Sequence, residues 1–419
     1  MYKSCFLVGY TKNLWRNLMQ EIFRDYKIAE IGGGVALAAA GKQFSDFGSN
    51  VLKIENIDGG EIRRAPPFFE DTPSLNSGGI HIFLNTGKQS VVIDYSNPSG
   101  MEIVSKIVND VDLVIIEEKP DAALQIIEQL KTTNPSTSTL AISPHGLKGP
   151  YANRQESDLS IFAQSTRLAR QRPSMDKNSL APVGYAPYTT AMQVGLTAGA
   201  IASAILWKNN SNPFAYHAEV SGVEALASNV DTPFVAWALT DGVMNYAPAS
   251  GRAAYPTGVY ECSDGHVQFT GADSPFFERC CIAIGRPEWA EDERFLDLDQ
   301  KPDHREEFLA HIIPWLKART KLEVFKIMQE AKVLCTPVFT VEEAINDPQA
   351  TARKSFTTFH QDGIGEVISP AYPFKEYMSD EEWNLTSAPK FGEHTQKVLE
   401  QLGYSTIEQQ ALFRIGTIK

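Results

Sequence analysis

The chain has 419 residues, of which 43% are hydrophobic and 21% are charged, a composition typical of a soluble globular enzyme with two or three domains. Its formal net charge of −13 at pH 7 argues against general nucleic-acid binding, which needs a basic surface, although a local basic pocket for a phosphorylated ligand stays open. The five cysteines show no CxxC or Cys/His ligand spacing, and no metal constellation stands out among the eight histidines. We therefore expect reduced thiols, a cytoplasmic protein without a bound metal, and neither a signal peptide nor a membrane span.

Residues 1–27 are expected to form a helical extension. Residues 11–25 carry apolar side chains at helical spacing, with Leu14, Leu18 and Ile22 in one row. Such a helix either docks on its own domain or binds a partner, and the sequence leaves both alternatives open.

Short apolar runs and amphipathic segments then alternate along the chain. The runs expected as strands are residues 28–31, 50–55, 90–94, 112–116 and 139–143. The segments expected as helices are residues 35–47, 99–109, 121–131 and 191–207. This alternation predicts an α/β fold with a parallel sheet covered by helices on both faces, whose ligands bind beyond the carboxyl ends of the strands.

The second half of the chain gives a more mixed pattern. A polar, Pro-containing linker is expected at 209–217, and residues 255–275 alternate like strands around a turn at Ser263-Asp264-Gly265. Further helices are expected at 304–319, 321–332 and 341–347, a strand at 334–340, and two short helices within 392–415.

Several polar or glycine-rich segments are candidate sites, each with a structural alternative. Gly32-Gly33-Gly34 follows a strand and opens a helix, which suits a phosphate, but the spacing is not GxGxxG and a tight turn explains it as well. Lys88 either meets a phosphate or is solvated. His145 ends a strand on the ligand side of the sheet, and Asp158 begins a helix, where a carboxylate also serves as a cap. Spacing alone thus indicates only an α/β protein.

A set of motifs, taken together, is far more specific. The chain resembles the class III CoA-transferases, the family of carnitine and formyl-CoA transferases, which also includes α-methylacyl-CoA racemases. The resemblance covers about 390 residues and rests on 47–55 (FGSNVLKIE), 85–90 (NTGKQS) with Asp94, 149–151 (GPY) with 157–159 (SDL), Gly195-Leu196, 347–349 (DPQ) and 392–395 (GEHT).

The resemblance implies a fold and a reaction. It implies a large Rossmann-like domain built from residues 28–220 and 331–419, a smaller α+β domain at 221–330, and two chains interlocked as a dimer. The family moves CoA between carboxylic acids, so a CoA thioester is a substrate and no cofactor is bound covalently. A nucleophilic Asp attacks the thioester and passes through an enzyme anhydride and an enzyme–CoA thioester.

The position of that nucleophilic Asp in this chain is Ala191, which has no heteroatom. The matching residues around it, Tyr188 and Gly195, make a shifted alignment implausible, and no Asp or Glu lies between Lys177 and Glu219. Only Asp158, His145 and Tyr188 are left as weak catalytic candidates. The racemase branch needs a His immediately before Asp158, where this chain has Ser157.

The resemblance places CoA contacts at six residues, namely Gly33, Gly34, Val35, Ala36, Ile93 and Lys119. The same region departs from the family, which usually has Asn-Phe-Arg-Pro-Gly where this chain has Glu117-Glu118-Lys119-Pro120-Asp121. Each extra carboxylate near the CoA phosphates costs on the order of 2–3 kcal/mol at about 6 Å.

Three functional hypotheses remain. In the first, the chain is the non-catalytic subunit of a heteromeric CoA-transferase, like the carboxylate-lacking subunit of the benzylsuccinate CoA-transferases, and a paralogous partner carries the Asp. Its substrates are then an acyl-CoA such as succinyl-CoA and a carboxylic acid, by analogy an aryl-substituted dicarboxylate. In the second, it is a homodimeric CoA-transferase with an engineered Asp-to-Ala change. In the third, it is an acyl-CoA-binding lyase or isomerase that uses His145, Tyr188 or Asp158.

Overall fold

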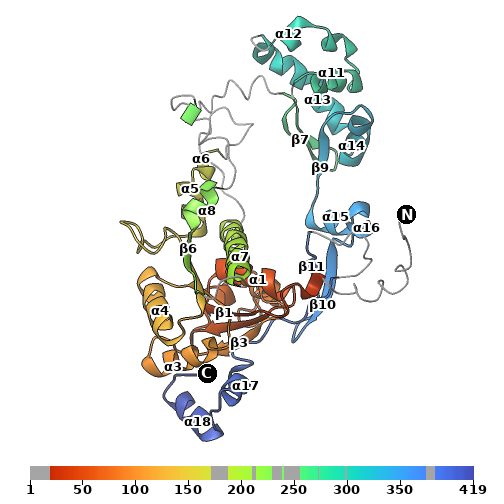
Figure 1. The fold of residues 1–419 in the computed structure, drawn as a ribbon. Coiled ribbons are helices and arrows are strands. Elements are labelled where there is room, and N and C mark those ends of the chain that lie inside the picture. Colours follow the sequence, from red (N-terminus) through yellow and green to blue (C-terminus); the bar gives the residue numbers. More distant parts are fainter. Residues whose placement is uncertain are drawn as a thin grey trace, which may run out of the picture. The chain divides into compact units, whose positions relative to one another are not determined.

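A computed structural model describes residues 19–170, 187–209, 214–228, 238–239, 255–271, 273–297, 300–373 and 383–419 (Figure 1). The chain divides into two compact units. Unit 1 comprises residues 1–169, 184–230 and 351–419, and unit 2 comprises residues 170–183 and 231–350. Unit 1 is therefore assembled from both ends of the chain.

Unit 1 contains a six-stranded parallel sheet in the order β3-β2-β1-β4-β5-β6, which confirms the expected α/β fold. Its strands are β1 (Lys27–Gly32), β2 (Asn50–Glu55), β3 (Gln89–Val92), β4 (Leu113–Glu117), β5 (Ser138–Ser143) and β6 (His217–Ser221). The strand β6 was not predicted, and it begins at the last residue of the linker expected at 209–217, of which residues 210–213 lie outside the described residues. It has little apolar character of its own and is a strand because its main chain pairs with β5.

Helices cover both faces of this sheet. They are α1 (Val35–Ser45), α2 (Gly79–Leu84), α3 (Pro98–Val108), α4 (Pro120–Thr133), α5 (Asp158–Gln164), α6 (Arg167–Arg170), α7 (Thr189–Asn209), α8 (Gly222–Ser228), α17 (Thr395–Gln401) and α18 (Thr406–Arg414). One apolar core joins α3, α4 and α17 to the sheet, and a second joins α1, α7 and α8 to the other face. Unit 1 also holds the 3-10 helices η1 (Met19–Glu21), η2 (Ile62–Arg64) and η3 (Phe69–Asp71), and the hairpin β10 (Phe356–Gln361) and β11 (Gly365–Pro370).

The helices α1 and α7 pack closely and run in the same direction. A Cβ added at Gly195 would lie 2.5 Å from the Ala36 carbonyl oxygen, and one at Gly199 would lie 2.1 Å from Gln43 Nε2. The backbone contact at Gly195 permits only glycine, and this close approach places the N-termini of both helices at one edge of the sheet. By length and composition α7 is the one described helix that could cross a membrane, although no span was expected from the sequence. Of its apolar window 44% is buried, and this part packs on α1 in the core.

The expected N-terminal helix at 11–25 lies mostly outside the described residues. From residue 19 the chain forms η1 and a turn, not an α-helix. Phe23 packs against Phe44 and Phe47 of the same unit, with ring centroids 5.0 and 6.3 Å apart. This end of the extension therefore docks on its own unit.

Unit 2 is a small α+β unit. Its antiparallel sheet contains β7 (Gly258–Cys262), β8 (Gly265–Phe269) and β9 (Cys335–Val338). Its helices are α11 (Phe276–Ala283), η4 (Pro287–Ala290), α12 (Glu293–Leu296), η5 (Lys301–His304), α13 (Arg305–Lys317), α14 (Lys321–Glu330), α15 (Val341–Asn346) and, across the unit boundary, α16 (Pro348–Ala352). Because β9 pairs with β8, residues 335–338 belong to this unit and not to the return segment that the sequence analysis places from 331. The four described cysteines are free and buried.

Two fully buried ion-pair clusters connect the strands of unit 1. Glu30 on β1 bonds Lys53 on β2 at 2.8 Å and Lys88 at 2.6 Å. Lys88 also donates to the Ala38 carbonyl oxygen at 2.8 Å. Lys88 is therefore neither solvated nor available to a phosphate, and both sequence interpretations of it were wrong.

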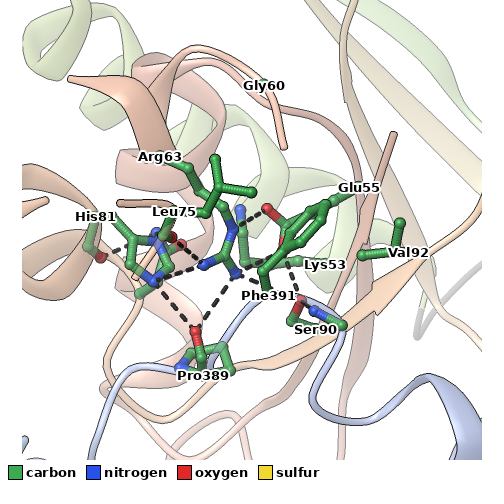
Figure 2. A network of polar contacts seen from close by, with 12 residues as sticks. Lys53, Glu55, Gly60, Arg63, Leu75, His81, Ser90, Val92, Pro389 and Phe391 are labelled. Atoms are coloured by element: carbon green, nitrogen blue, oxygen red, sulfur yellow. Dashed lines mark hydrogen bonds and ion pairs between the residues drawn. The ribbon is translucent and has the colours of Figure 1, made fainter. Parts of the chain in front are cut away.

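The second cluster fastens the C-terminal segment to the sheet (Figure 2). Arg63 donates to both oxygens of Glu55, at 2.5 and 2.7 Å, and to the Leu75 carbonyl oxygen at 2.8 Å. His81 Nε2 lies 3.1 Å from the Pro389 carbonyl oxygen. Residues more than 300 positions apart thus share one buried polar network.

We predict that Arg63→Ala lowers the free energy of unfolding by about 3–5 kcal/mol, because it leaves the buried Glu55 carboxylate unpaired. Arg63→Lys should lower the free energy of unfolding by less, since lysine keeps the positive charge but loses the bidentate hydrogen bonding to Glu55. Urea denaturation followed by circular dichroism measures both.

The matched control is Arg64→Ala. Arg64 pairs with Asp58 in an exposed contact, so its removal should change the free energy of unfolding by less than about 1 kcal/mol. Equal losses from the Arg63 and Arg64 variants would contradict a special role for the buried pair.

Candidate functional site

The sheet order places a topological switch point between β1 and β4, where α/β proteins bind ligands. At this edge Gly32 pairs with Glu117 in the strand register, and Gly32-Gly33-Gly34 leads into α1. Gly32 has φ +125°, and a Cβ there would lie 2.3 Å from the Glu117 carbonyl oxygen. The turn is therefore held tightly against the end of β4.

The remaining glycines of the turn are covered by this chain's own residues. A Cβ added at Gly33 would lie 2.4 Å from the Gly60 Cα, and the Gly33 carbonyl oxygen accepts from Ile62 N at 2.9 Å. A Cβ at Gly34 would lie 2.1 Å from the carboxylate of Glu117. The next residues, Val35 and Ala36, are buried.

The Glu117 side chain reaches the N-terminus of α1. Its Oε2 accepts from Leu37 N at 2.6 Å, and the N-cap residue Gly34 provides no side-chain cap. The pKa of Glu117 is raised to about 7. Desolvation is the largest cause and the nearby acids Glu61 and Glu118 add to it, whereas the Leu37 amide and Lys53 oppose the rise. This carboxyl group therefore titrates near neutral pH.

A second carboxylate lies at the N-terminus of the neighbouring helix α7. Asp158 Oδ1 accepts from Ala191 N at 2.7 Å. Ser157 and Ser160 form a capping box that begins α5 at Asp158, which fixes the position of this carboxylate. Tyr188 has φ 68° just before α7, and it packs with Ala191 against the apolar cluster that contains Val35. The structure thus brings Asp158, Tyr188 and Ala191 together.

The pKa of the Tyr188 hydroxyl is raised by desolvation and by the carboxylates of Glu61 and Asp158. The phenol is therefore held in its neutral, proton-donating form. The carboxylate of Glu61 contributes to the raised pKa of both Glu117 and Tyr188, and it was not among the residues expected at the site. Nothing in the sequence signals it, because it is one exposed acid in a loop.

His145 has different partners. Its Nε2 lies 2.8 Å from Glu156 Oε1, and its ring packs edge-on against Tyr151 at 5.8 Å. The hydrogen bonds from His145, Ser160 and Gln164 lower the pKa of Glu156 to about 2. In the described part of the chain, no hydrogen bond joins His145 to Asp158 or Tyr188.

The last two candidate CoA contacts lie in different surroundings. Ile93 is buried in the core, where its backbone forms a bridge with Ile418. Lys119 is exposed and precedes α4 at the carboxyl end of β4. Contact of either residue with CoA stays a prediction. No group of three or more potential metal ligands occurs among the residues that the structure describes.

Comparison with known proteins identifies the class. A family model described as CoA-transferase family III matches residues 23–395, so the chain belongs to this family.

Individual relatives support the same assignment. The chain is 26% identical to the BbsE subunit of succinyl-CoA:(R)-benzylsuccinate CoA-transferase from Thauera aromatica, over 96% of this chain and 99% of the relative. It is also 26% identical to succinate–glutarate CoA-transferase from Agrobacterium fabrum, over 92% and 96%. A crystal structure of a CAIB/BAIF family protein from Brucella suis shares the fold, with a TM-score of 0.76, 21% identity, and coverage of 91% and 99%.

The raised pKa of Glu117 leads to a pH-dependent prediction. Between about pH 4.5 and pH 7 the folded state keeps a proton that the unfolded state has released, so stability falls as pH rises through this window. Glu117→Gln removes this term. We expect the stability of the Gln variant relative to the unaltered protein to rise by about 2 kcal/mol between pH 5 and pH 8.

Urea denaturation at pH 5, 6, 7 and 8 measures this difference. Glu102→Gln, which alters an exposed side chain on α3, is the control and should follow the pH profile of the unaltered protein. Parallel profiles for the Glu117→Gln variant and the unaltered protein would show that Glu117 does not titrate in this range.

Proposed function

We propose that this chain is the non-catalytic subunit of a class III CoA-transferase, a complex that moves CoA between carboxylic acids. The observation that carries the proposal is the N-terminus of α7, where residue 191 is Ala and its amide is bound by Asp158. Covalent transfer of CoA requires a carboxylate on the attacking residue, and a methyl group cannot form the anhydride.

Asp158 is a poor substitute for the missing nucleophile. One of its oxygens accepts from Ala191 N, and the N-terminus of α7 stabilises its negative charge. A carboxylate stabilised in this way gains little from attacking a thioester. Asp158 therefore serves as a cap for α7 in this proposal.

A paralogous chain with the nucleophilic Asp is the proposed partner, in an interlocked pair within the cytoplasm. The relative from Thauera aromatica supports this, since its name describes one subunit of a CoA-transferase. By the same relationship, the proposed substrates are an acyl-CoA such as succinyl-CoA and an aryl-substituted dicarboxylic acid.

The two other hypotheses have less support. A homodimeric enzyme with an engineered Asp-to-Ala change would keep an intact CoA site, yet Glu117 and Glu118 bring two acids to that edge. A lyase or isomerase would need an uncommitted acid–base group beside Tyr188. Asp158 lies there, but one of its oxygens accepts from the Ala191 amide. His145 instead pairs with Glu156.

The proposal predicts that the purified chain alone neither turns over succinyl-CoA nor forms a covalent adduct with CoA. We expect the same of the Ala191→Asp variant, because the substitution restores the nucleophilic carboxylate but not the CoA-binding site. Intact-mass measurement after incubation with succinyl-CoA detects the adduct. Turnover by the unaltered chain, or an adduct on Ala191→Asp, would overturn the proposal.

Two controls make a negative result informative. Ala191→Asn has the same size as the Asp variant but no nucleophile, so it reports nonspecific acylation. The double variant Ala191→Asp with Asp158→Asn removes the repulsion between two neighbouring carboxylates. If this double variant is folded and still forms no adduct, repulsion is not the reason.

A further inference from the structure

The edge between β1 and β4 has the general features of a nucleotide site. It is the switch point of a parallel sheet, it follows a glycine-rich turn, and it presents the first amides of α1, an 11-residue helix. In folds of this kind, a phosphate accepts hydrogen bonds from such amides.

In this chain a side chain already occupies that position. Glu117 Oε2 accepts from Leu37 N at 2.6 Å, and its carboxylate fills the space that the missing Cβ of Gly34 leaves. The loop that carries Gly60 closes over Gly33 from the other side. The glycine turn thus fits an internal carboxylate, not an external ligand.

The charges around this carboxylate also disfavour an anion. Glu61 and Glu118 both lie close enough to raise the pKa of Glu117. Lys53 opposes the raised pKa of Glu117, but it is already paired with Glu30 at 2.8 Å. Glu118 accepts from the Tyr95 hydroxyl at 2.5 Å, which holds it in place. Glu61 and Glu118 would therefore repel a diphosphate at this edge.

We propose that the Glu117 side chain occupies the position of a ligand phosphate at the N-terminus of α1. It thereby prevents this chain from binding ligands with an adenosine diphosphate group, CoA among them. The inference rests on the proposed non-catalytic role and extends it, because it explains how the chain keeps its fold without its substrate. Glu117 caps α1 in place of the ligand's phosphate.

The test is isothermal titration of CoA and of ADP at pH 8 into the full-length chain and its variants. We expect no measurable binding to the unaltered chain. Glu117→Ala removes both the charge and the volume, and should tighten the binding of both ligands by about tenfold or more. Glu117→Gln removes only the charge and should give a smaller gain.

The matched control is Glu118→Gln, which removes the adjacent acid but leaves Glu117 on α1. A gain from this variant equal to that from Glu117→Ala would mean that total charge, not occupancy, excludes the ligand, and would overturn the inference. Circular dichroism confirms folding. If Glu117→Ala does not fold, Glu117→Asn takes its place, since it keeps a shorter polar group near Leu37 N.

The remaining outcomes separate this inference from the proposed function. Binding of CoA to the unaltered chain, or no gain from a folded Glu117→Ala or Glu117→Asn variant, overturns the role of Glu117. CoA binding to the unaltered chain would also remove the argument made above against the homodimeric hypothesis. The proposed non-catalytic role itself fails only if the chain turns over substrate or if Ala191→Asp forms the adduct.

Discussion

The structure of unit 1 depends on charges that are buried completely and therefore have to be paired. Arg63 and Glu55 have no exposed side-chain surface, so either one alone would leave an uncompensated charge in the core. Their pairing fixes the segment after β2, which in turn sets Gly60 against Gly33 and Ile62 N on the Gly33 carbonyl oxygen. The glycine turn is thus connected, through the segment that carries Gly60, to an ion pair outside the site; Figure 2 shows Gly60 near this pair.

Much of this fold could be predicted from the sequence because apolar periodicity carries most of the information. The first five strands and the helices α1, α3, α4 and α7 occur within a few residues of their predicted positions. The strand β6 was missed because its sequence, HAEVS, is polar and only its pairing with β5 makes it a strand. Lys88 was misread for a related reason. Its partner Glu30 is 58 residues away, and no local pattern reveals that distance.

The candidate site was predictable only in part. Ala191 could be recognised because the residues around it match a motif, but the contact of its amide with Asp158 joins residues 33 positions apart. Glu117 was expected to repel the CoA phosphates, and the structure adds that it caps α1. The two parallel helices α1 and α7 therefore each begin with a carboxylate from elsewhere in the chain. The close packing of the two helices depends on Gly195 and Gly199 of α7. The sequence pattern does not reveal this role of the two glycines.

The discontinuity of unit 1 also affects how the protein is made. On the ribosome the sheet strands emerge first, but Leu399 and Ile418 complete one of its two cores, and Pro389 accepts from the buried polar network. The core of the nascent N-terminal half therefore stays incomplete, with part of its apolar surface exposed, until residues 399 and 418 have left the exit tunnel. Unit 2, whose sheet comes from residues 258–338, has its whole framework available earlier. Synthesis thus imposes an order in which the inserted unit can fold before the unit that surrounds it in sequence.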